Sequence, residues 1–205
     1  MAAEPAGLRP RARRMGSVAM LARPVQHDVN NLLTVVFANL ELLKRTAAEG
    51  PPQRQLDRIQ VAARRLDSST RAMLNLLRRP TGQVGELRLS EAVGALEPLL
   101  GLLLTAGTLD LELPEGDPMV RLDRAAFEDA LLAIAQQASE GMPREGKLRI
   151  AVEAGPDEAS LVLTWPEGLV LPGLPALAAL GRELDGRVEE AAGLLRLSLP
   201  AEPAT

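Results

Sequence analysis

Apolar residues recur at helical spacing in the first 80 positions of the chain. From Val18 to Leu43 they advance in steps of three, four and seven, which predicts an amphipathic helix. This stripe consists of Val18, Leu21, Val25, Val29, Leu32, Val36 and Leu43, widened by Phe37 and Leu40. Pro24 lies inside the run, so the helix either kinks there or begins there. Glu49-Gly50-Pro51-Pro52 is expected to break the helix.

A second helical pattern follows, with apolar positions at alternating steps of three and four, as in coiled coils and four-helix bundles. It consists of Leu56, Ile59, Ala63, Leu66, Thr70, Met73 and Leu77. A hairpin of these two helices has too little surface to bury both stripes. We therefore expect two chains to form a dimeric four-helix bundle. The alternative is that the hairpin packs on the rest of its own chain.

The period changes after a turn-rich segment at residues 79–85. Ser90 is expected to cap a helix that ends near Thr105, and Asp123 to cap another that ends near Glu140. Further elements are predicted as strands at 109–113, 147–153 and 160–165, a short helix near 176–184, and a hairpin from 187–190 to 194–200. Helices that alternate with mostly non-adjacent strands predict an α/β sandwich with one helical layer on one sheet.

The predicted fold class is therefore α+β, with an antiparallel helical hairpin before the sandwich. Residues 15–80 are expected to form the hairpin domain and residues 86–205 the sandwich domain. Residues 1–14 carry four arginines without an apolar segment after them, so we interpret them as a disordered tail and not as a signal peptide. A cytoplasmic location follows by default.

Composition narrows the possible functions. Aromatic residues make up 1% of the chain and the net charge is −4, which argues against nucleic acid as a partner. No apolar run reaches the roughly 20 residues that a membrane span needs. The chain has no cysteine and a single histidine, so a thiolate site or a multi-histidine metal site within one subunit is excluded.

The single histidine, His27, lies two residues from Val25 and from Val29 and therefore points away from the apolar stripe. On a helix, four polar residues share its face: Arg23, Asn30, Asn31 and Thr34. A neutral imidazole nitrogen can attack an electrophile while the neighbouring carboxylate, Asp28, orients the proton on the other nitrogen. The amides can hold a phosphoryl oxygen or a water. A solvated histidine without a chemical role would show the same pattern.

The segment His27-Asp28-Val29-Asn30-Asn31-Leu32-Leu33, followed by Asn39-Leu40-Glu41-Leu42-Leu43, resembles the H-box helix of bacterial sensor histidine kinases. The resemblance is closest to the group whose motif reads His-Asp-Phe-Asn-Asn-Leu-Leu. It implies that His27 is the phosphoacceptor and Asp28 the adjacent acid. It also places Asn31 where these proteins often carry a residue that assists dephosphorylation of a response regulator.

The resemblance continues into the N-box helix of the kinases' ATP-binding domain, which residues 123–146 match in hydrophobic spacing and in the ending Met142-Pro143. The asparagine that holds magnesium and phosphates in the kinases is Gln137 here. Their Asp-x-Gly-x-Gly motif is replaced by Trp165-Pro166-Glu167-Gly168, and no Gly-x-Gly occurs among the 17 glycines. The segment from Trp165 to Ala176 is also too short for an ATP lid. We therefore expect a degenerate domain that does not bind nucleotide.

The resulting prediction is a histidine phosphotransferase, similar to the dimeric alphaproteobacterial phosphotransferases built on a decayed kinase core. His27 would take a phosphoryl group from one receiver-domain aspartate and return it to another, with Arg23, Asn30 and Thr34 contacting the partner. Response-regulator receivers or a hybrid histidine kinase are the expected partners. The receiver would supply Mg²⁺, so the chain needs no cofactor of its own. The alternatives are a scaffold that binds response regulators without being phosphorylated, a residual kinase, and a response-regulator phosphatase.

Overall fold

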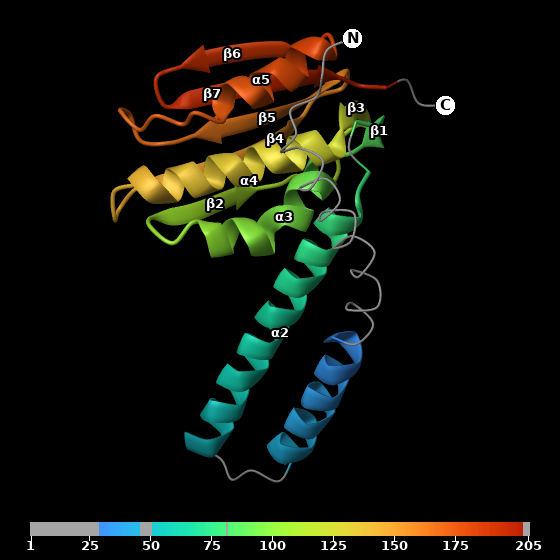
Figure 1. Ribbon diagram of the computed structural model, residues 1–205, viewed down its shortest axis with the longest axis vertical. Helices are drawn as coiled ribbons and strands as arrows, with labels where there is room; N and C mark the ends of the chain where they lie inside the picture. The colour runs from blue at the N-terminus through green and yellow to red at the C-terminus, as the bar shows by residue number, and fades with distance from the viewer. Residues whose placement is uncertain (1–28, 46–50, 81, 203–205) are drawn as a thin grey trace, which may run out of the picture. The chain divides into compact units, whose positions relative to one another are not determined.

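The computed structural model describes residues 29–45, 51–80 and 82–202, and the chain divides into two compact units, residues 1–79 and 80–205 (Figure 1). Each unit is considered by itself. The described part of the first unit is a helical hairpin made of a helix at residues 29–45 and helix α2, Pro51–Arg78. The predicted tail at residues 1–14 and the beginning of the first predicted helix lie outside the described residues.

Polar contacts near the turn hold the two helices of the hairpin together. Lys44 Nζ lies 2.9 Å from Asp57 Oδ1 and donates a 3.0 Å hydrogen bond to Gln60 Oε1. Gln60 Nε2 in turn donates a 2.9 Å hydrogen bond to Glu41 Oε1. These contacts fix the antiparallel register, because they join the end of the first helix to the beginning of α2.

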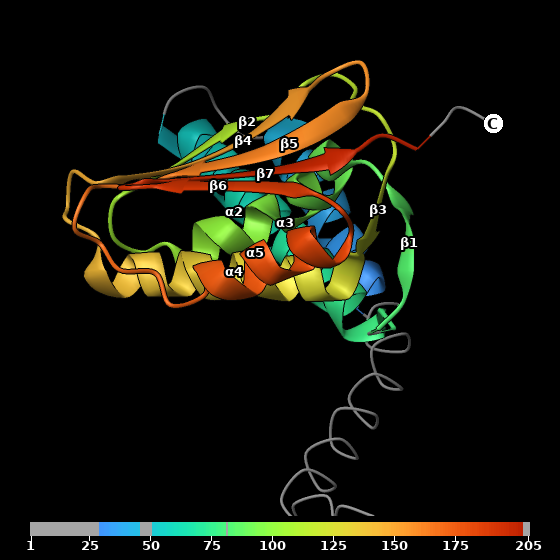
Figure 2. The same cartoon turned by 90° about the horizontal axis from the view of Figure 1, so that it is seen from above.

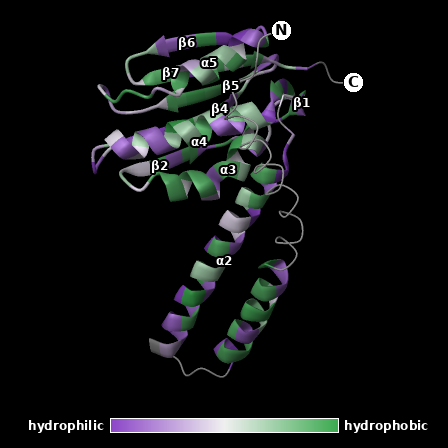
Figure 3. Cartoon of the chain, in the orientation of Figure 1, coloured by the Kyte–Doolittle hydropathy of each residue, from purple (hydrophilic) through white to green (hydrophobic). Residues whose placement is uncertain are grey.

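Among the described residues of the first helix, the predicted apolar stripe is turned inward in part. Leu40 of that stripe is buried and Phe37 is half-buried. Leu33, which lies outside the stripe, is also buried, whereas Leu32, Val36 and Leu43 of the stripe are exposed. On α2 the predicted line is split in the same way, since alternate members are half-buried or exposed. The half-buried members are Leu56, Ala63 and Thr70, and the exposed ones are Ile59, Leu66 and Met73. Figure 3 shows hydrophobic residues along both helices.

The second unit contains a five-stranded sheet in the order β2-β4-β5-β7-β6. The strands are β2 (Thr108–Glu112), β4 (Lys147–Ala154), β5 (Glu158–Thr164), β6 (Arg187–Ala191) and β7 (Leu194–Pro200). Three helices, α3 (Leu89–Leu103), α4 (Arg124–Gly141) and α5 (Leu174–Glu183), lie on one face of this sheet (Figure 2). This confirms the predicted sandwich with one helical layer. The four-helix bundle, which requires a second chain, stays a prediction.

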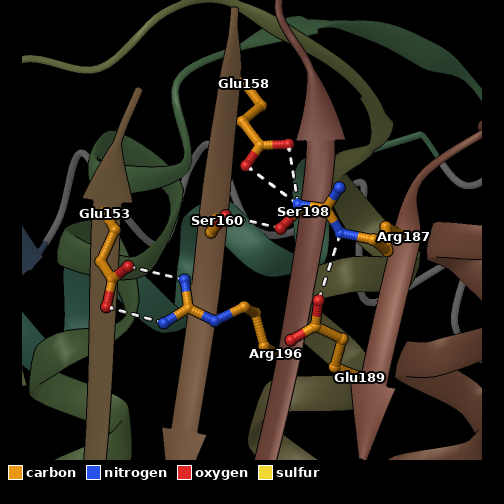
Figure 4. Close-up of polar contacts among 7 residues, drawn as sticks. All are labelled: Glu153, Glu158, Ser160, Arg187, Glu189, Arg196 and Ser198. Carbon is orange, nitrogen blue, oxygen red and sulfur yellow. Dashed lines mark hydrogen bonds and ion pairs between the residues drawn. The ribbon is translucent and has the colours of Figure 1, made fainter. Parts of the chain in front are cut away.

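Strand alternation explains why one face of the sheet is covered and the other is not. The leucines and isoleucines of β4, β5 and β7 that face the helices are fully buried: Leu148, Ile150, Leu161, Leu163, Leu195 and Leu197. The opposite face carries cross-strand polar contacts instead, between Glu153 and Arg196, Arg187 and Glu158, and Ser160 and Ser198 (Figure 4). The polar side chains of the outer face therefore pair with one another, and this face can remain in contact with solvent without a second layer of helices.

Two local predictions need correction. Ser90 does not cap α3: the N-cap is Arg88, without a side-chain cap, and the Ser90 hydroxyl and main-chain N–H both donate to the buried carboxylate of Asp117. The end of the turn-rich segment forms strand β1 (Val84–Leu87), which pairs antiparallel with the unpredicted strand β3 (Val120–Asp123). The pairing joins Leu87 to Val120 and Val84 to Asp123, which are 33 and 39 positions apart, so it cannot be predicted from a local pattern.

The prediction for Asp123 is confirmed. Its Oδ1 accepts hydrogen bonds of 3.0 and 3.2 Å from the main-chain N–H groups of Ala125 and Ala126, which begin α4. Its other oxygen accepts a 2.8 Å hydrogen bond from the main-chain N–H of Gly82. One carboxylate thus caps α4 and also ties the beginning of the second unit to that helix.

A buried carboxylate on α4 makes the stability of the second unit depend on pH. Burial raises the pKa of Glu128 from 4.5 to about 7, although Arg124, whose Nε donates a 2.8 Å hydrogen bond to Glu128 Oε1, acts in the opposite direction. Because the folded state binds the proton more tightly, the free energy of unfolding should fall as the pH rises from 4.5 through about 7. Denaturant unfolding at pH 4.5 and pH 8 should show this decline in the wild type. It should be much smaller in Glu128→Gln, and an equal decline in both proteins would contradict the assignment.

Candidate functional site

The residues predicted to act in phosphotransfer belong to the first helix. His27, Asp28 and Arg23 lie outside the described residues, so their roles stay predictions. The helix at residues 29–45 carries the other three, Asn30, Asn31 and Thr34. Asn31 and Thr34 are exposed, whereas Asn30 is half-buried. Asn31 and Thr34 are therefore accessible to a partner, and Asn30 lies partly inside the hairpin.

Hydrogen bonding limits what Thr34 can offer a partner. Its hydroxyl donates a 2.8 Å hydrogen bond to the main-chain carbonyl of Asn30, one turn earlier. The proton of this hydroxyl is thus engaged within the helix, while its oxygen can still accept a hydrogen bond from a docking molecule. Asn39 makes a similar contact, because its Nδ2 donates to the carbonyl of Val35 at 2.8 Å.

In the second unit, the side chain of Gln137 is bound to the chain's own loop. Gln137 Oε1 accepts a 2.7 Å hydrogen bond from the main-chain N–H of Gly173, the residue that precedes α5. A Cβ atom at Gly173 would lie 3.1 Å from both Gln137 Oε1 and Ile134 Cγ1. Glycine therefore allows the beginning of α5 to approach α4 closely.

The loop of residues 165–173 contacts α4 through Leu169 and Gly173. Trp165 Nε1 donates a 3.0 Å hydrogen bond to the carbonyl of Leu169. Leu169 packs against Gly141, since a Cβ atom there would lie only 2.6 Å from Leu169 Cδ1. Gly168 adopts a positive φ of 84°, a conformation that favours glycine. The loop is thus held by contacts near both of its ends.

An open hollow of about 510 Å³ lies where β4 begins and β5 ends, with Pro143, Trp165 and Pro166 in its wall. Its two cationic side chains are already paired within the sheet. Lys147 Nζ lies 3.4 Å from Asp110 Oδ2, and Arg149 Nε donates a 2.9 Å hydrogen bond to Glu112 Oε1. This pairing leaves the hollow without a free charge that would select an anionic ligand.

Two classes of site are also absent from the part of the chain that the structure describes. No three acidic or histidine side chains converge there as a metal site would require. None of the described helices is both long and apolar enough to cross a membrane.

Comparison with known proteins relates the chain to sensor histidine kinases. No protein-family model matches the sequence. Sensor kinase CckA of Brucella abortus (strain 2308) is 28% identical over 142 residues, which cover 68% of this chain and 15% of that protein. The chain is thus similar to a sensor kinase over about two thirds of its length, while it spans only a small part of that relative.

Several solved structures of histidine kinases show a likeness in coordinates. The catalytic domain of histidine kinase ThkA has a TM-score of 0.45 at 17% identity, covering 60% of this chain and 99% of that one. Acinetobacter baumannii histidine kinase AdeS has a TM-score of 0.43 at 16% identity and covers 86% of this chain and 98% of its own. ThkA in complex with the response regulator TrrA has a TM-score of 0.44 at 16% identity, with 95% and 65% covered. Likenesses of this size define neither an activity nor a partner for this chain.

The contact between Gln137 and Gly173 predicts how the loop responds to mutation. Gln137→Ala removes the acceptor for the Gly173 N–H, so amide hydrogen exchange should become faster in residues 166–173. Exchange in the central strands β4 and β5 should be unchanged. Gln136→Ala is the matched control, because Gln136 is the exposed neighbour on the same helix and its amide donates a 3.5 Å hydrogen bond to Glu140, on that helix as well. Equal exchange in both variants would show that the hydrogen bond does not hold the loop.

Proposed function

We propose that this chain is a histidine phosphotransferase that moves phosphoryl groups between receiver-domain aspartates by way of His27, without binding ATP. An imidazole nitrogen of His27 attacks the phosphorus of an aspartyl phosphate. The P–O bond to the aspartate breaks, and the carboxylate leaves with the bonding electrons. Asp28 holds the proton on the other ring nitrogen. The reverse reaction passes the group to the aspartate of a second receiver, and the receiver supplies Mg²⁺ in both steps.

The main support for a chain that does not bind ATP is the 2.7 Å hydrogen bond from Gly173 N to Gln137 Oε1. By its resemblance to the N-box, Gln137 occupies the position of the residue that holds magnesium and phosphates in the kinases. Here that amide oxygen is occupied by the loop. By the same resemblance, Trp165, whose indole donates a hydrogen bond to the Leu169 carbonyl, stands in the sequence where those kinases carry their glycine-rich motif. A nucleotide would have to displace both contacts.

The partner proposed for the first helix is a receiver domain. Asn31 and Thr34 are exposed beside the His27 segment, so a receiver can reach this face. The related protein CckA is a sensor kinase, and the structural neighbour ThkA was solved in complex with a response regulator. The second unit would then serve as an additional docking surface that helps to select the receiver.

A homodimer is part of the proposal because each helix of the hairpin leaves an apolar line uncovered. Leu32, Val36 and Leu43 of the first helix are 61%, 41% and 53% exposed. Ile59, Leu66 and Met73, spaced seven residues apart on α2, are 51%, 59% and 54% exposed. Heptad spacing on both helices is what a second copy of the hairpin needs to complete a four-helix bundle.

Asn31 favours phosphatase activity as a second function of the same surface. It is exposed, and the resemblance places it where sensor kinases carry a residue that assists dephosphorylation. Its amide could hold a water in line with the phosphoryl group of a docked receiver. Transfer would then depend on His27 and hydrolysis on Asn31.

The phosphotransfer proposal predicts which substrate labels the protein. Purified protein incubated with a labelled, phosphorylated receiver should acquire the label, whereas labelled ATP alone should not label it. His27→Ala should reduce labelling to background, because the nucleophile is lost. Asn31→Ala should keep phosphotransfer and slow the loss of label as free phosphate.

Other outcomes would indicate a different function for this chain. Labelling by ATP would make it a kinase and would contradict the proposal that it does not bind ATP. Binding of a receiver without labelling, and with the same affinity in His27→Ala, would make it a scaffold.

The dimer predicts that a charge on the exposed line separates the chains. Leu66→Glu places a carboxylate where the second copy would bury leucine, so light scattering should report half the mass of the wild type. Arg64→Glu changes an exposed residue outside the apolar line and should leave the mass unchanged. A wild-type protein that is monomeric at micromolar concentration would refute this part of the proposal.

A further inference from the structure

The inner line of the first helix contains a polar residue close to the predicted phosphoacceptor. The line turned toward α2 repeats every three or four positions and consists of Asn30, Leu33, Phe37, Leu40 and Lys44, all buried or half-buried. Asn30 is three residues from His27 in sequence. It is therefore the member of this line that lies nearest to the proposed reaction.

The register of the hairpin places Asn30 among apolar residues of α2. Lys44 lies level with residues 57–60, as its contacts with Asp57 and Gln60 show. Two antiparallel α-helices advance by the same rise per residue, so Asn30, 14 residues before Lys44, lies level with residues 71–74. Ala72 and Leu74 in that stretch are both buried.

The side-chain carbonyl oxygen of Asn30 is buried and has no hydrogen-bond partner. The polar residues at the other end of the hairpin differ in this respect, because Lys44, Gln60 and Glu41 are joined by hydrogen bonds. A buried acceptor without a donor has lost its hydration and gained nothing in exchange, so it destabilises the packed state. Local opening that admits water would relieve this cost.

The main chain at the same position is also perturbed. The Asn30 carbonyl accepts the hydroxyl of Thr34 at 2.8 Å, a contact to the residue one turn later that often bends a helix. The unpaired amide oxygen and the side-chain contact to the backbone thus coincide in one turn, next to the His27 segment. Asn39 makes a similar contact to the carbonyl of Val35 further along, so the unpaired oxygen of Asn30 is what distinguishes this turn from the leucine-rich turns that follow.

We propose that Asn30 is a positioning residue that keeps the turn beside His27 deformable, so that the imidazole can be brought in line with the phosphoryl group of a docked receiver. This inference rests on the proposed phosphotransfer function. In-line transfer requires close alignment of the attacking nitrogen, phosphorus and leaving oxygen, and each receiver presents its aspartate in a slightly different place. A polar residue that weakens the packing between the two helices at Asn30 would let the imidazole adjust to each receiver.

The test compares Asn30→Leu with Gln60→Leu in the full-length protein. Leucine branches at Cγ as asparagine does, and it removes the unpaired oxygen at position 30. At position 60 the same change removes two hydrogen bonds. Asn30→Leu should therefore raise the midpoint of thermal unfolding by roughly 4–8 °C, and Gln60→Leu should not raise it. Asn30→Ala, which adds no volume, should also raise the midpoint and serves if leucine does not fit.

Two readouts separate positioning from stability alone. Amide exchange in residues 31–35 should slow in Asn30→Leu and not in Gln60→Leu. The rate of labelling at saturating phosphorylated receiver should fall by roughly tenfold in Asn30→Leu, with unchanged receiver affinity, because the buried oxygen does not touch the partner. Gln60→Leu should keep the wild-type rate.

Three results would each overturn the inference. The first is a lower unfolding midpoint in both Asn30 variants, and the second is a raised midpoint with a wild-type rate of transfer. The third is reduced receiver affinity in Asn30→Leu, since Asn30 would then be a contact residue. Failure of the proposed function is recognised separately, because the wild-type protein would then not be labelled at all.

Discussion

The hydrogen bond from the main-chain N–H of Gly173 to the side-chain oxygen of Gln137 holds α5 and the preceding loop against α4. Glutamine is longer than asparagine by one methylene group, and this extra reach brings its amide to the loop. Gly173 makes the approach possible, because a side chain there would meet Gln137 and Ile134. Trp165, bonded to Leu169, closes the other end of the same loop. These contacts hold the loop of residues 165–173 in place at both of its ends.

The two units differ in how far their apolar surfaces are covered. The sheet of the second unit has an apolar face under the three helices and an outer face on which Glu153 meets Arg196 and Arg187 meets Glu158. Such exposed ion pairs each contribute little to stability, about 0–1 kcal/mol. They nevertheless keep the open face of the sheet polar, which disfavours association through it. The line that contains Leu66 on the hairpin of the first unit is exposed, and this contrast favours the hairpin as the surface for self-association.

Polar groups inside the hairpin divide into a satisfied set and an unsatisfied one. Near the turn, Lys44 donates a hydrogen bond to Gln60, which in turn donates one to Glu41, and these bonds fix the register. Near the proposed phosphoacceptor, the amide oxygen of Asn30 has no partner. A helix that is anchored at one end and weakened at the other is suited to a reaction in which the second end must adapt to different partners.

The sequence by itself determined the features that depend on neighbouring residues. Strands β4 and β5, helix α2 and the Asp123 cap of α4 follow from periodicity and capping, which act over a few positions. The resemblance around His27, and the glutamine at position 137 where the N-box carries asparagine, are likewise found from the sequence alone. The tertiary structure alone decided the contacts between distant segments: Ser90 with Asp117, β1 with β3, and Gln137 with Gly173. It also decided that Leu33 and not Leu32 faces inward. One residue rotates a helix face by about 100°, and on a wide apolar stripe only the packing partner selects which edge is buried.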